Sequence, residues 1–246
     1  MASAGKRVLI TGAARRIGRV IAIELSRRGF QVAIHFNTSR EEAESVSREC
    51  GGAPIFKADL ASVDEIRRLF RDVGTQFGLL DCLVNNAARF TRFDPLAITE
   101  ADWDFIHSVN LKATFFCCQE VARQMQELGA GRIVNISSLG GIRPWAEHAH
   151  YCASKAGVIM LTKALAKAFA PQITVNSVAP GVISFNDVDE RTQNDADDRV
   201  QRMIDATPMR RAGKPEEIAE AVHFFLTAPD FITGQILAVD GGLNDR

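Results

Sequence analysis

A tyrosine and a lysine four residues apart, Tyr151 and Lys155, are the side chains of this sequence best suited to chemistry. On a helix, residues i and i+4 share a face, so the phenol and the ammonium group would address one reacting centre. A nearby cation is expected to lower the tyrosine pKa from its ordinary value of about 10, which would make the phenol a proton donor and acceptor near neutrality. Ser138, thirteen residues earlier, would hold the substrate oxygen on which charge develops.

The first thirty residues predict a strand, a glycine-containing turn and a helix. Val8-Leu9-Ile10 is a short apolar run, as expected of a strand buried on both faces. Apolar residues then recur at helical spacing from Ile17 to Leu25, and Gly29 is placed to end the helix. In the turn around Gly12, free N–H groups and the positive end of the helix dipole would face an anion. The segment predicts a phosphate-binding turn, although it lacks the Gly-x-Gly-x-x-Gly pattern.

Together with later segments, these motifs make the sequence resemble the short-chain dehydrogenase/reductase family over nearly its whole length. The matching motifs occur in the family's order and at its spacing. They are Thr11-Gly12 with Gly18, Asp59-Leu60, Asn85-Asn86-Ala87, Asn110, Ser138 with Tyr151 and Lys155, Pro180-Gly181, and Asp240-Gly241-Gly242. One departure is Ala88, which stands where the family has the glycine of Asn-Asn-Ala-Gly. The resemblance implies an oxidoreductase that uses a nicotinamide dinucleotide.

The resemblance also implies roles for single residues. Asn110, Ser138, Tyr151 and Lys155 match the family's catalytic tetrad: Tyr151 supplies the proton, Ser138 positions the substrate, Lys155 holds the ribose, and Asn110 supports a water-mediated proton path. The cofactor contacts that it implies, besides Tyr151 and Lys155, are Thr11, Gly12, Arg15, Arg16, Ile17, Gly18, Asp59, Leu60, Asn86, Ala87, Pro180 and Gly181.

Composition limits the classes of function. A chain of 246 residues, 46% of them hydrophobic, can bury a sizeable core as one domain. A net charge of −1 argues against a nucleic-acid partner, which would require a basic surface. The five cysteines form no Cys-x-x-Cys pair, and the histidines lack metal-ligand spacing, so we expect no metal. We expect neither a signal peptide nor a membrane span, and hence a cytoplasmic protein.

Alternating strand and helix patterns predict a single-domain doubly wound parallel α/β sheet, Rossmann-type, over residues 1–246. The predicted helices include Glu100–Leu128 and Tyr151–Phe169, and an irregular acidic segment at about 184–207 is expected to be a substrate lid. Apolar residues spread around Tyr151–Phe169 predict burial on two sides, the second in a subunit interface. The family resemblance implies a dimer or tetramer. The predicted strands are Arg7–Thr11, Gln31–Phe36, Pro54–Lys57, Asp81–Asn85, Arg132–Ser137, Gln172–Val178 and Gln235–Val239.

The end of the second predicted strand favours NADP(H) over NAD(H). NAD-selective proteins place an acidic side chain there for the ribose hydroxyls. The segment from Ile34 to Arg40 has no acid but offers the Ser39 hydroxyl and the Arg40 guanidinium, which would bind a 2′-phosphate. The alternative is that Arg40 belongs to the following helix and faces solvent.

Arg16 and Phe90 are the residues that bear on the substrate. Most family members have glycine at the position of Arg16, and an arginine there, with Phe90 after the Asn-Asn-Ala motif, resembles the pteridine reductase branch. A guanidinium and an aromatic face suit a flat heteroaromatic ring. That branch, however, has an aspartate thirteen residues before its tyrosine, where this chain has Ser138, as carbonyl reductases do.

The sequence therefore leaves three functions open. The first is NADPH-dependent reduction of a pterin-like ring, contacted by Arg16, Phe90, Ser138 and Tyr151. The second is reduction of a 3-oxoacyl-[acyl-carrier-protein] or another carbonyl by the same tetrad. The third is a dinucleotide-binding sensor without catalysis, which the complete tetrad disfavours because such a protein has no need of all four residues.

Overall fold

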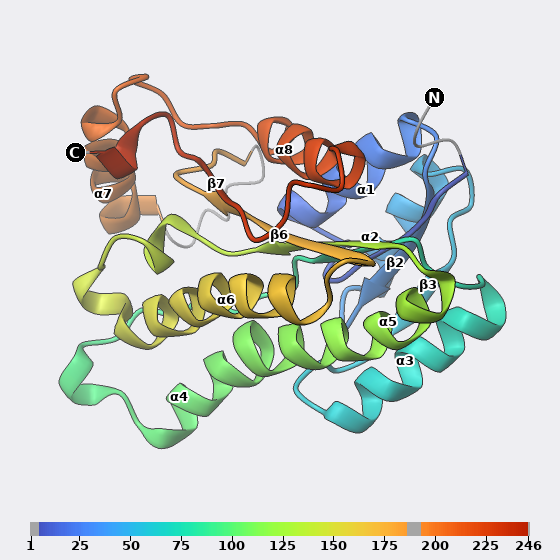
Figure 1. Ribbon diagram of the computed structural model, residues 1–246. Helices are drawn as coiled ribbons and strands as arrows, with labels where there is room; N and C mark the ends of the chain where they lie inside the picture. The colour runs from blue at the N-terminus through green and yellow to red at the C-terminus, as the bar shows by residue number, and fades with distance from the viewer. Residues whose placement is uncertain (1–4, 186–192, 246) are drawn as a thin grey trace.

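One seven-stranded, all-parallel sheet forms the centre of the protein (Figure 1). The computed structural model describes residues 5–185 and 193–245. The strand order is β3-β2-β1-β4-β5-β6-β7, so the chain reverses direction across the sheet between β1 and β4. The strands are β1 (Arg7–Ile10), β2 (Gln31–Phe36), β3 (Ile55–Lys57), β4 (Cys82–Asn85), β5 (Gly131–Ile136), β6 (Ile173–Pro180) and β7 (Ile236–Val239).

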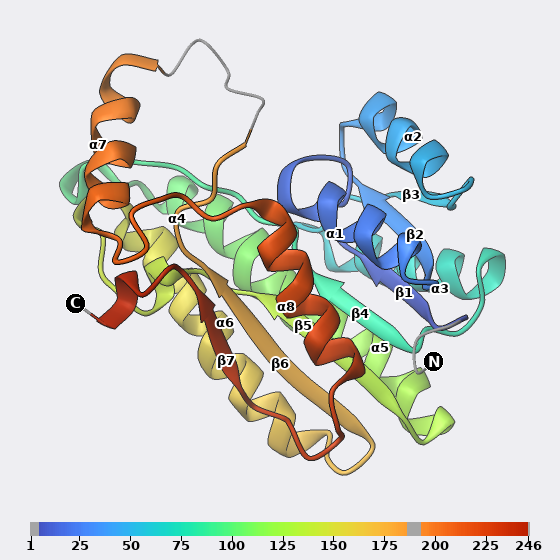
Figure 2. The ribbon, with the colours of Figure 1, turned by 90° about the horizontal axis from the view of Figure 1, so that it is seen from above.

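Helices cover both faces of this sheet, which gives three layers (Figure 1), and Figure 2 looks down onto one of the two helical layers. One face carries α1 (Arg16–Arg27), α2 (Arg40–Glu49) and α8 (Pro215–Thr227). The other face carries α3 (Val63–Gln76), α5 (Thr114–Leu128) and α6 (Ala149–Ala168). Two further helices, α4 (Glu100–His107) and α7 (Gln193–Ala206), lie toward the ends of the strands where loops gather.

The apolar strands follow from this double covering. In β1, Val8 and Ile10 point into the core beneath α1 and α8, whereas Leu9 points into the core beneath α3 and α5. Because neither face of the sheet meets water, the strand contains no alternating polar positions. All three side chains are completely buried.

The predicted fold and strands are confirmed, with strand ends that differ by at most two residues from the prediction. The predicted helix Glu100–Leu128 differs in one respect, because a π-helical segment, Ser108–Ala113, separates α4 from α5. π-helical turns have no signal in hydrophobic periodicity and often mark functional sites. The predicted helix Tyr151–Phe169 is α6, which begins at Ala149 and ends at Ala168.

The predicted lid, about 184–207, coincides in part with α7. Its residues 186–192 lie outside the described residues. Among the helices of the described chain, none combines the length and apolar character needed to cross a membrane. Within residues 5–185 and 193–245, no group of three or more His, Cys, Asp or Glu side chains is placed to hold a metal ion.

Candidate active site

A cavity of about 850 Å³ lies at the carboxyl ends of strands β1 to β6. In open parallel α/β sheets, ligands bind at this edge, where the order of the strands reverses. The predicted residues that line it are Gly12, Arg15, Arg16, Ile17, Gly18, Ser39, Asp59, Leu60, Asn86, Ala87, Phe90, Ser138, Tyr151, Lys155, Pro180 and Gly181. Three predicted residues, Thr11, Arg40 and Asn110, are outside the cavity wall.

Tyr151 and Lys155 occupy one face of α6, as the spacing predicted, and both side chains are buried. The Lys155 ammonium donates a hydrogen bond to the carbonyl of Ile136, the last residue of β5, at 2.8 Å. Its nitrogen lies 6.0 Å from the centroid of the Tyr151 ring. Burial lowers the pKa of Lys155 to about 8, because desolvation penalises the charged form.

The expected lowering of the Tyr151 pKa is wrong. Burial raises the pKa of Tyr151 to about 12, and the hydrogen bond from Ser138 opposes this rise only in part. The physical reason is that burial desolvates the phenol, and the group that opposes the rise is the Ser138 hydroxyl and not a cation. Tyr151 is therefore a neutral phenol at pH 7 and suited to donate a proton.

Ser138 lies two residues beyond the end of β5, at the start of the short turn Leu139–Gly141, and is fixed by its surroundings. Its hydroxyl oxygen accepts a hydrogen bond from the backbone N–H of Gly140 at 3.0 Å. The turn packs tightly on α6, since a Cβ at Gly141 would lie 2.7 Å from the carbonyl carbon of Lys155. This close approach holds the Ser138 hydroxyl beside the Tyr151 phenol.

Asn110 lies in the π-helical segment, behind the cavity wall, and is almost completely buried. Its side chain accepts from the backbone N–H of Arg89 at 2.7 Å and donates to the carbonyl of Arg89 at 2.9 Å. A further bond joins it to the Ser154 hydroxyl at 3.1 Å. Asn110 thus fixes the chain that follows β4 against α6, and its part in a proton path stays a prediction.

Thr11 joins the ends of β1 and β4 beneath the turn around Gly12. Its hydroxyl oxygen accepts from the backbone N–H groups of Asn86 and Ala87 at 2.9 and 3.0 Å. The Asn86 side chain in turn donates to the carbonyls of Thr11 and Gly12 at 2.9 and 3.0 Å. Gly12 has a φ of 63°, and a Cβ there would lie 2.9 Å from the Cα of Ala87. Only glycine satisfies both conditions.

His35 lines the cavity and was not predicted as a site residue. Its Nδ1 accepts from the backbone N–H of Gly12 at 3.0 Å, and its Nε2 donates to the carbonyl of Ala58 at 3.1 Å. Burial lowers the pKa of His35 to about 4, so the imidazole is neutral at pH 7. A histidine inside the apolar run of Val32–Phe36 was the available signal.

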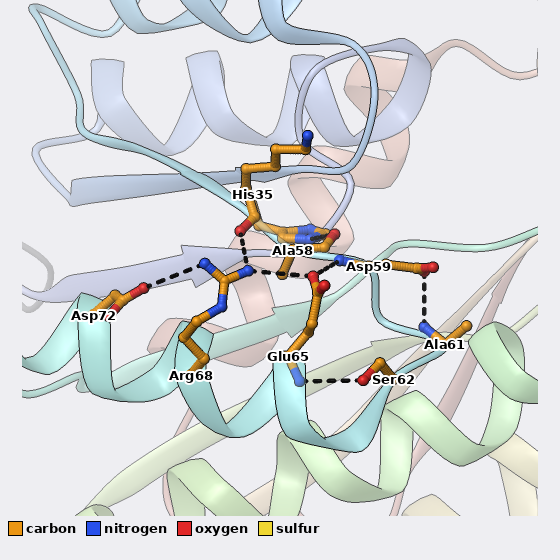
Figure 3. A network of polar contacts seen from close by, with 9 residues as sticks. His35, Ala58, Asp59, Ala61, Ser62, Glu65, Arg68 and Asp72 are labelled. Carbon is orange, nitrogen blue, oxygen red and sulfur yellow. Dashed lines mark hydrogen bonds and ion pairs between the residues drawn. The ribbon is translucent and has the colours of Figure 1, made fainter.

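The network around His35 continues to the segment after β3 (Figure 3). The backbone N–H of Asp59 donates to a Glu65 carboxylate oxygen at 2.6 Å, and Arg68 donates to the same oxygen at 3.2 Å. Asp59 accepts from the N–H of Ala61 at 3.0 Å. These bonds hold Asp59 at the cavity wall, on the opposite side of His35 from Gly12.

Arg16 begins α1 with a φ of 52°, in the left-handed region that favours glycine. Its guanidinium lies at the cavity wall, 5.7 Å from the centroid of the Phe185 ring. A non-glycine residue held in this conformation is a reason to look for function. Sequence reasoning did not single out Phe185, Arg89 or Trp145, which also line the cavity.

Comparisons with known proteins agree with this geometry. A family model described as enoyl-(acyl carrier protein) reductase matches residues 12–244. The chain is 38% identical to the 3-oxoacyl-[acyl-carrier-protein] reductase FabG of Staphylococcus epidermidis over 97% of this chain and 98% of the relative, and 39% identical to that of Staphylococcus aureus over the same shares. The chain belongs to the short-chain dehydrogenase/reductase family. It is therefore an oxidoreductase, and we do not retain the sensor hypothesis.

Solved structures of this family superpose closely on the chain. A putative short-chain alcohol dehydrogenase from Sinorhizobium meliloti has a TM-score of 0.91 and 35% identity, covering 98% of this chain and 96% of that one. A gluconate 5-dehydrogenase from Burkholderia cenocepacia, solved with NADP and tartrate, has a TM-score of 0.89 and 32% identity, covering 99% and 96%.

The cavity of this short-chain dehydrogenase/reductase fits a dinucleotide. Its volume lies within the range of about 300–1,000 Å³ that is usual for cofactor sites. The N-terminus of α1 opens on it beside Arg15 and Arg16, with no acidic residue in the first turn, which suits phosphate groups. When bound, a nicotinamide dinucleotide would supply the hydride. Lys155, Tyr151 and Ser138 lie together in the same wall.

Proposed function

We propose that this enzyme reduces a carbonyl group with NADPH and that its substrate is a 3-oxoacyl thioester or a related ketone. The observation that carries the proposal is the pairing of a neutral Tyr151 phenol with the Ser138 hydroxyl in one cavity wall. A carbonyl oxygen that becomes an alkoxide needs one group to orient it and one to protonate it. The relatives named as 3-oxoacyl-[acyl-carrier-protein] reductases support the same substrate class.

In this mechanism each residue acts on a defined atom. Ser138 donates a hydrogen bond to the substrate carbonyl oxygen and holds it beside the phenol. Tyr151 transfers its proton to that oxygen as negative charge develops there. Lys155, anchored on the Ile136 carbonyl, would hold the ribose hydroxyls and stabilise the tyrosinate left after proton transfer.

NADP(H) is the cofactor we propose. The Ser39 hydroxyl lines the cavity at the end of β2, and Arg15 and Arg16 add positive charge beside it. The family's structure solved with NADP supports this choice. Arg40 is less well placed than the sequence suggested, since it begins α2, lies outside the cavity wall and pairs with Glu44 at 3.1 Å.

A pterin-like ring is the second candidate substrate, and Phe90 favours it. The side chain is 58% exposed, and its ring packs against Tyr151 at 4.8 Å between centroids, nearly perpendicular to it. Arg16 lines the same cavity. A flat heteroaromatic substrate would gain contacts from both. Ser138 in place of an acid keeps this candidate second, because an acid is the group suited to protonate a ring nitrogen.

A panel of substrates tests the proposal. The purified enzyme would be assayed for NADPH oxidation with acetoacetyl thioesters, simple 3-oxo esters and dihydropterin at equal concentrations. We expect the 3-oxo compounds to be reduced with the largest kcat/KM. Turnover of dihydropterin alone would transfer the assignment to the second candidate, and oxidation of NADPH with none of them would overturn the proposed function.

We further propose a homo-oligomer, a dimer or tetramer, in the cytoplasm. The face of α6 away from the sheet is partly uncovered, with Met160 64% exposed. Beside it, Phe115, Phe116 and Leu161 line a second hollow of about 520 Å³. Apolar surface of this kind on a helix face suits a subunit contact. Sedimentation of the wild type and of a Met160→Lys variant would test this, since a charge at the contact should shift the mass toward the monomer.

A further inference from the structure

The loop that follows β4 is fixed to the segment that precedes α6, although neither is regular secondary structure along most of its length. We call residues 89–94 the strap. The backbone N–H of Phe93 donates to the carbonyl of Glu147 at 3.0 Å, and the Nδ1 of His148 donates to the carbonyl of Thr91 at 2.9 Å. The Thr91 hydroxyl lies 2.7 Å from the Nε2 of His150. These bonds cross a sequence separation of more than fifty residues.

The other end of the strap is also fixed. Asn110 binds both backbone groups of Arg89, at 2.7 and 2.9 Å. The Arg89 guanidinium lies 4.0 Å from the centroid of the Phe105 ring and donates to the Phe105 carbonyl at 3.0 Å. Arg92 forms a two-pronged pair with Glu147 on the exposed side, at 2.8 and 3.0 Å. The strap is thus held at both ends by contacts within the chain.

Phe90 is the strap side chain that faces the reacting phenol. Its ring stacks on the imidazole of His148 with centroids 4.6 Å apart and planes 22° apart, while its edge meets Tyr151. His148 therefore holds this part of the strap in two ways. Its ring stacks on the Phe90 ring, and its Nδ1–H binds the carbonyl of the next residue, Thr91. His148 itself does not line the cavity. Its ring contacts two side chains of the cavity wall, Phe90 and Trp145, and the Trp145 ring lies edge-on to it at 5.8 Å between centroids.

We propose that His148 is a positioning residue that fixes Phe90 beside Tyr151, and that Phe90 then selects substrates by the group attached to the reacting carbonyl. Because contacts within the chain already fix Phe90, a substrate that binds against its ring does not lose free energy in ordering the loop. The contact therefore affects the binding of the substrate and not the proton transfer. Flat or aromatic groups gain from the fixed ring, and small groups do not reach it. This inference rests on the proposed carbonyl reduction.

The experiment compares two 3-oxo esters that differ only in the group on the ketone carbon. Ethyl acetoacetate carries a methyl group and ethyl benzoylacetate a phenyl ring. For His148→Ala, we expect the KM for the phenyl ester to rise about two- to tenfold, the range that the loss of an ordered aromatic pair supports. The kcat and KM for the methyl ester should stay within error of the wild type.

Two further variants separate the contacts of His148. Asparagine at this position keeps an N–H for the Thr91 carbonyl but removes the ring, so His148→Asn should recover part of the lost affinity. Arg92→Gln is the matched control, because it loosens the strap at an exposed ion pair, and such pairs contribute little. It should leave the ratio of the two esters unchanged.

A double-mutant cycle tests whether His148 acts through Phe90. If it does, His148→Ala adds nothing to the effect of Phe90→Ala on the phenyl ester. Fully additive effects, or equal losses on both esters, would overturn the inference while leaving carbonyl reduction intact.

A measurement that needs no turnover completes the test. In proteins with labelled phenylalanine rings, the Phe90 signal is assigned by its loss in Phe90→Leu. It should shift in His148→Asn and stay in place in Arg92→Gln. An unmoved signal would refute the positioning role even if neither ester were a substrate, whereas a shifted signal with no reduction of either ester would refute only the proposed function.

Discussion

The two halves of the cavity are built in different ways. In the half that we propose to hold the cofactor, the cofactor half, hydrogen bonds to backbone groups join the ends of neighbouring strands through Thr11, Asn86, His35 and Gly12. In the half that we propose to hold the substrate, the substrate half, two loops meet through side chains, with Phe90 and His148 at the contact. The first half is tied to the register of the sheet, so changes there disturb the fold. The second half can be altered while the sheet stays intact. Loops of this kind are where proteins that share one fold differ in their substrates.

The largest expected effect lies where the halves meet, at Tyr151. Tyr151→Phe removes the proposed proton donor, and proton transfer is worth roughly 10²–10⁴-fold in rate. We expect kcat to fall by that factor while the Kd for NADPH changes little, measured by fluorescence titration. Cys152→Ala, a change at the adjacent half-buried residue, should leave kcat unaltered. Reduction by Tyr151→Phe at the parent rate would contradict the mechanism.

The titration of His35 should show that the contacts of the cofactor half contribute to the stability of the fold. Because its pKa is about 4 in the folded protein and about 6.5 when unfolded, only the unfolded chain binds a proton between these values. The wild-type free energy of unfolding should therefore fall as the pH drops from 6.5 toward 4, by on the order of 3 kcal/mol from this residue.

Urea unfolding at several pH values measures this loss. His35→Asn should be less stable at pH 7, since the bonds to Gly12 and Ala58 are disturbed, but should lack this share of the acid sensitivity. Parallel pH curves for the variant and the wild type would show that His35 does not link the two strands in the way the structure indicates.

Arg16 tests whether the strained backbone in the cofactor half contributes to ligand binding. Arg16→Gly should raise the free energy of unfolding by about 1 kcal/mol, because a left-handed φ costs an L-residue roughly this much. The same change should weaken NADPH or substrate by about tenfold or more, the value of a lost charge-assisted bond. Thermal melting and binding titration measure the two effects.

Arg210 provides the control for Arg16. It has a φ of 53° but lies outside the cavity wall, so Arg210→Gly removes similar strain without touching a ligand. Stability should rise and affinity should stay the same. If both glycine variants bind NADPH and substrate as the wild type does, Arg16 has no role in the site.

The smallest expected effect separates two neighbours at the edge of the cofactor half. Ser39→Ala should lower the preference for NADPH over NADH by up to about tenfold, since a hydroxyl bond to a charged phosphate is lost. Arg40→Ala should hardly change the preference, because this side chain already pairs with Glu44 outside the cavity wall. The ratio of kcat/KM with NADPH to kcat/KM with NADH measures this preference. A larger effect of Arg40→Ala than of Ser39→Ala would show that Arg40, and not Ser39, selects the cofactor.

Local patterns explain why so much of the fold could be predicted. Each strand is a short apolar run bounded by turn residues, and the spacing of Tyr151 and Lys155 holds on any helix. The π-helical segment around Asn110 could not be predicted, because it differs from the flanking helices in its backbone hydrogen bonds and no residue type marks that change. The pKa of Tyr151 was predicted in the wrong direction because charge can be counted from a sequence but desolvation cannot.

The sequence by itself determined the family and the sheet, since apolar runs, glycine turns and the four-residue spacing of Tyr151 and Lys155 are patterns that lie along the chain. Only the tertiary structure decided which side chains share the cavity. It placed His35 between Gly12 and Ala58, removed Arg40 from the cavity wall and brought His148 onto Phe90. These contacts join segments that are far apart in the chain, and their distances and burial arise only when the sheet and its loops are packed together.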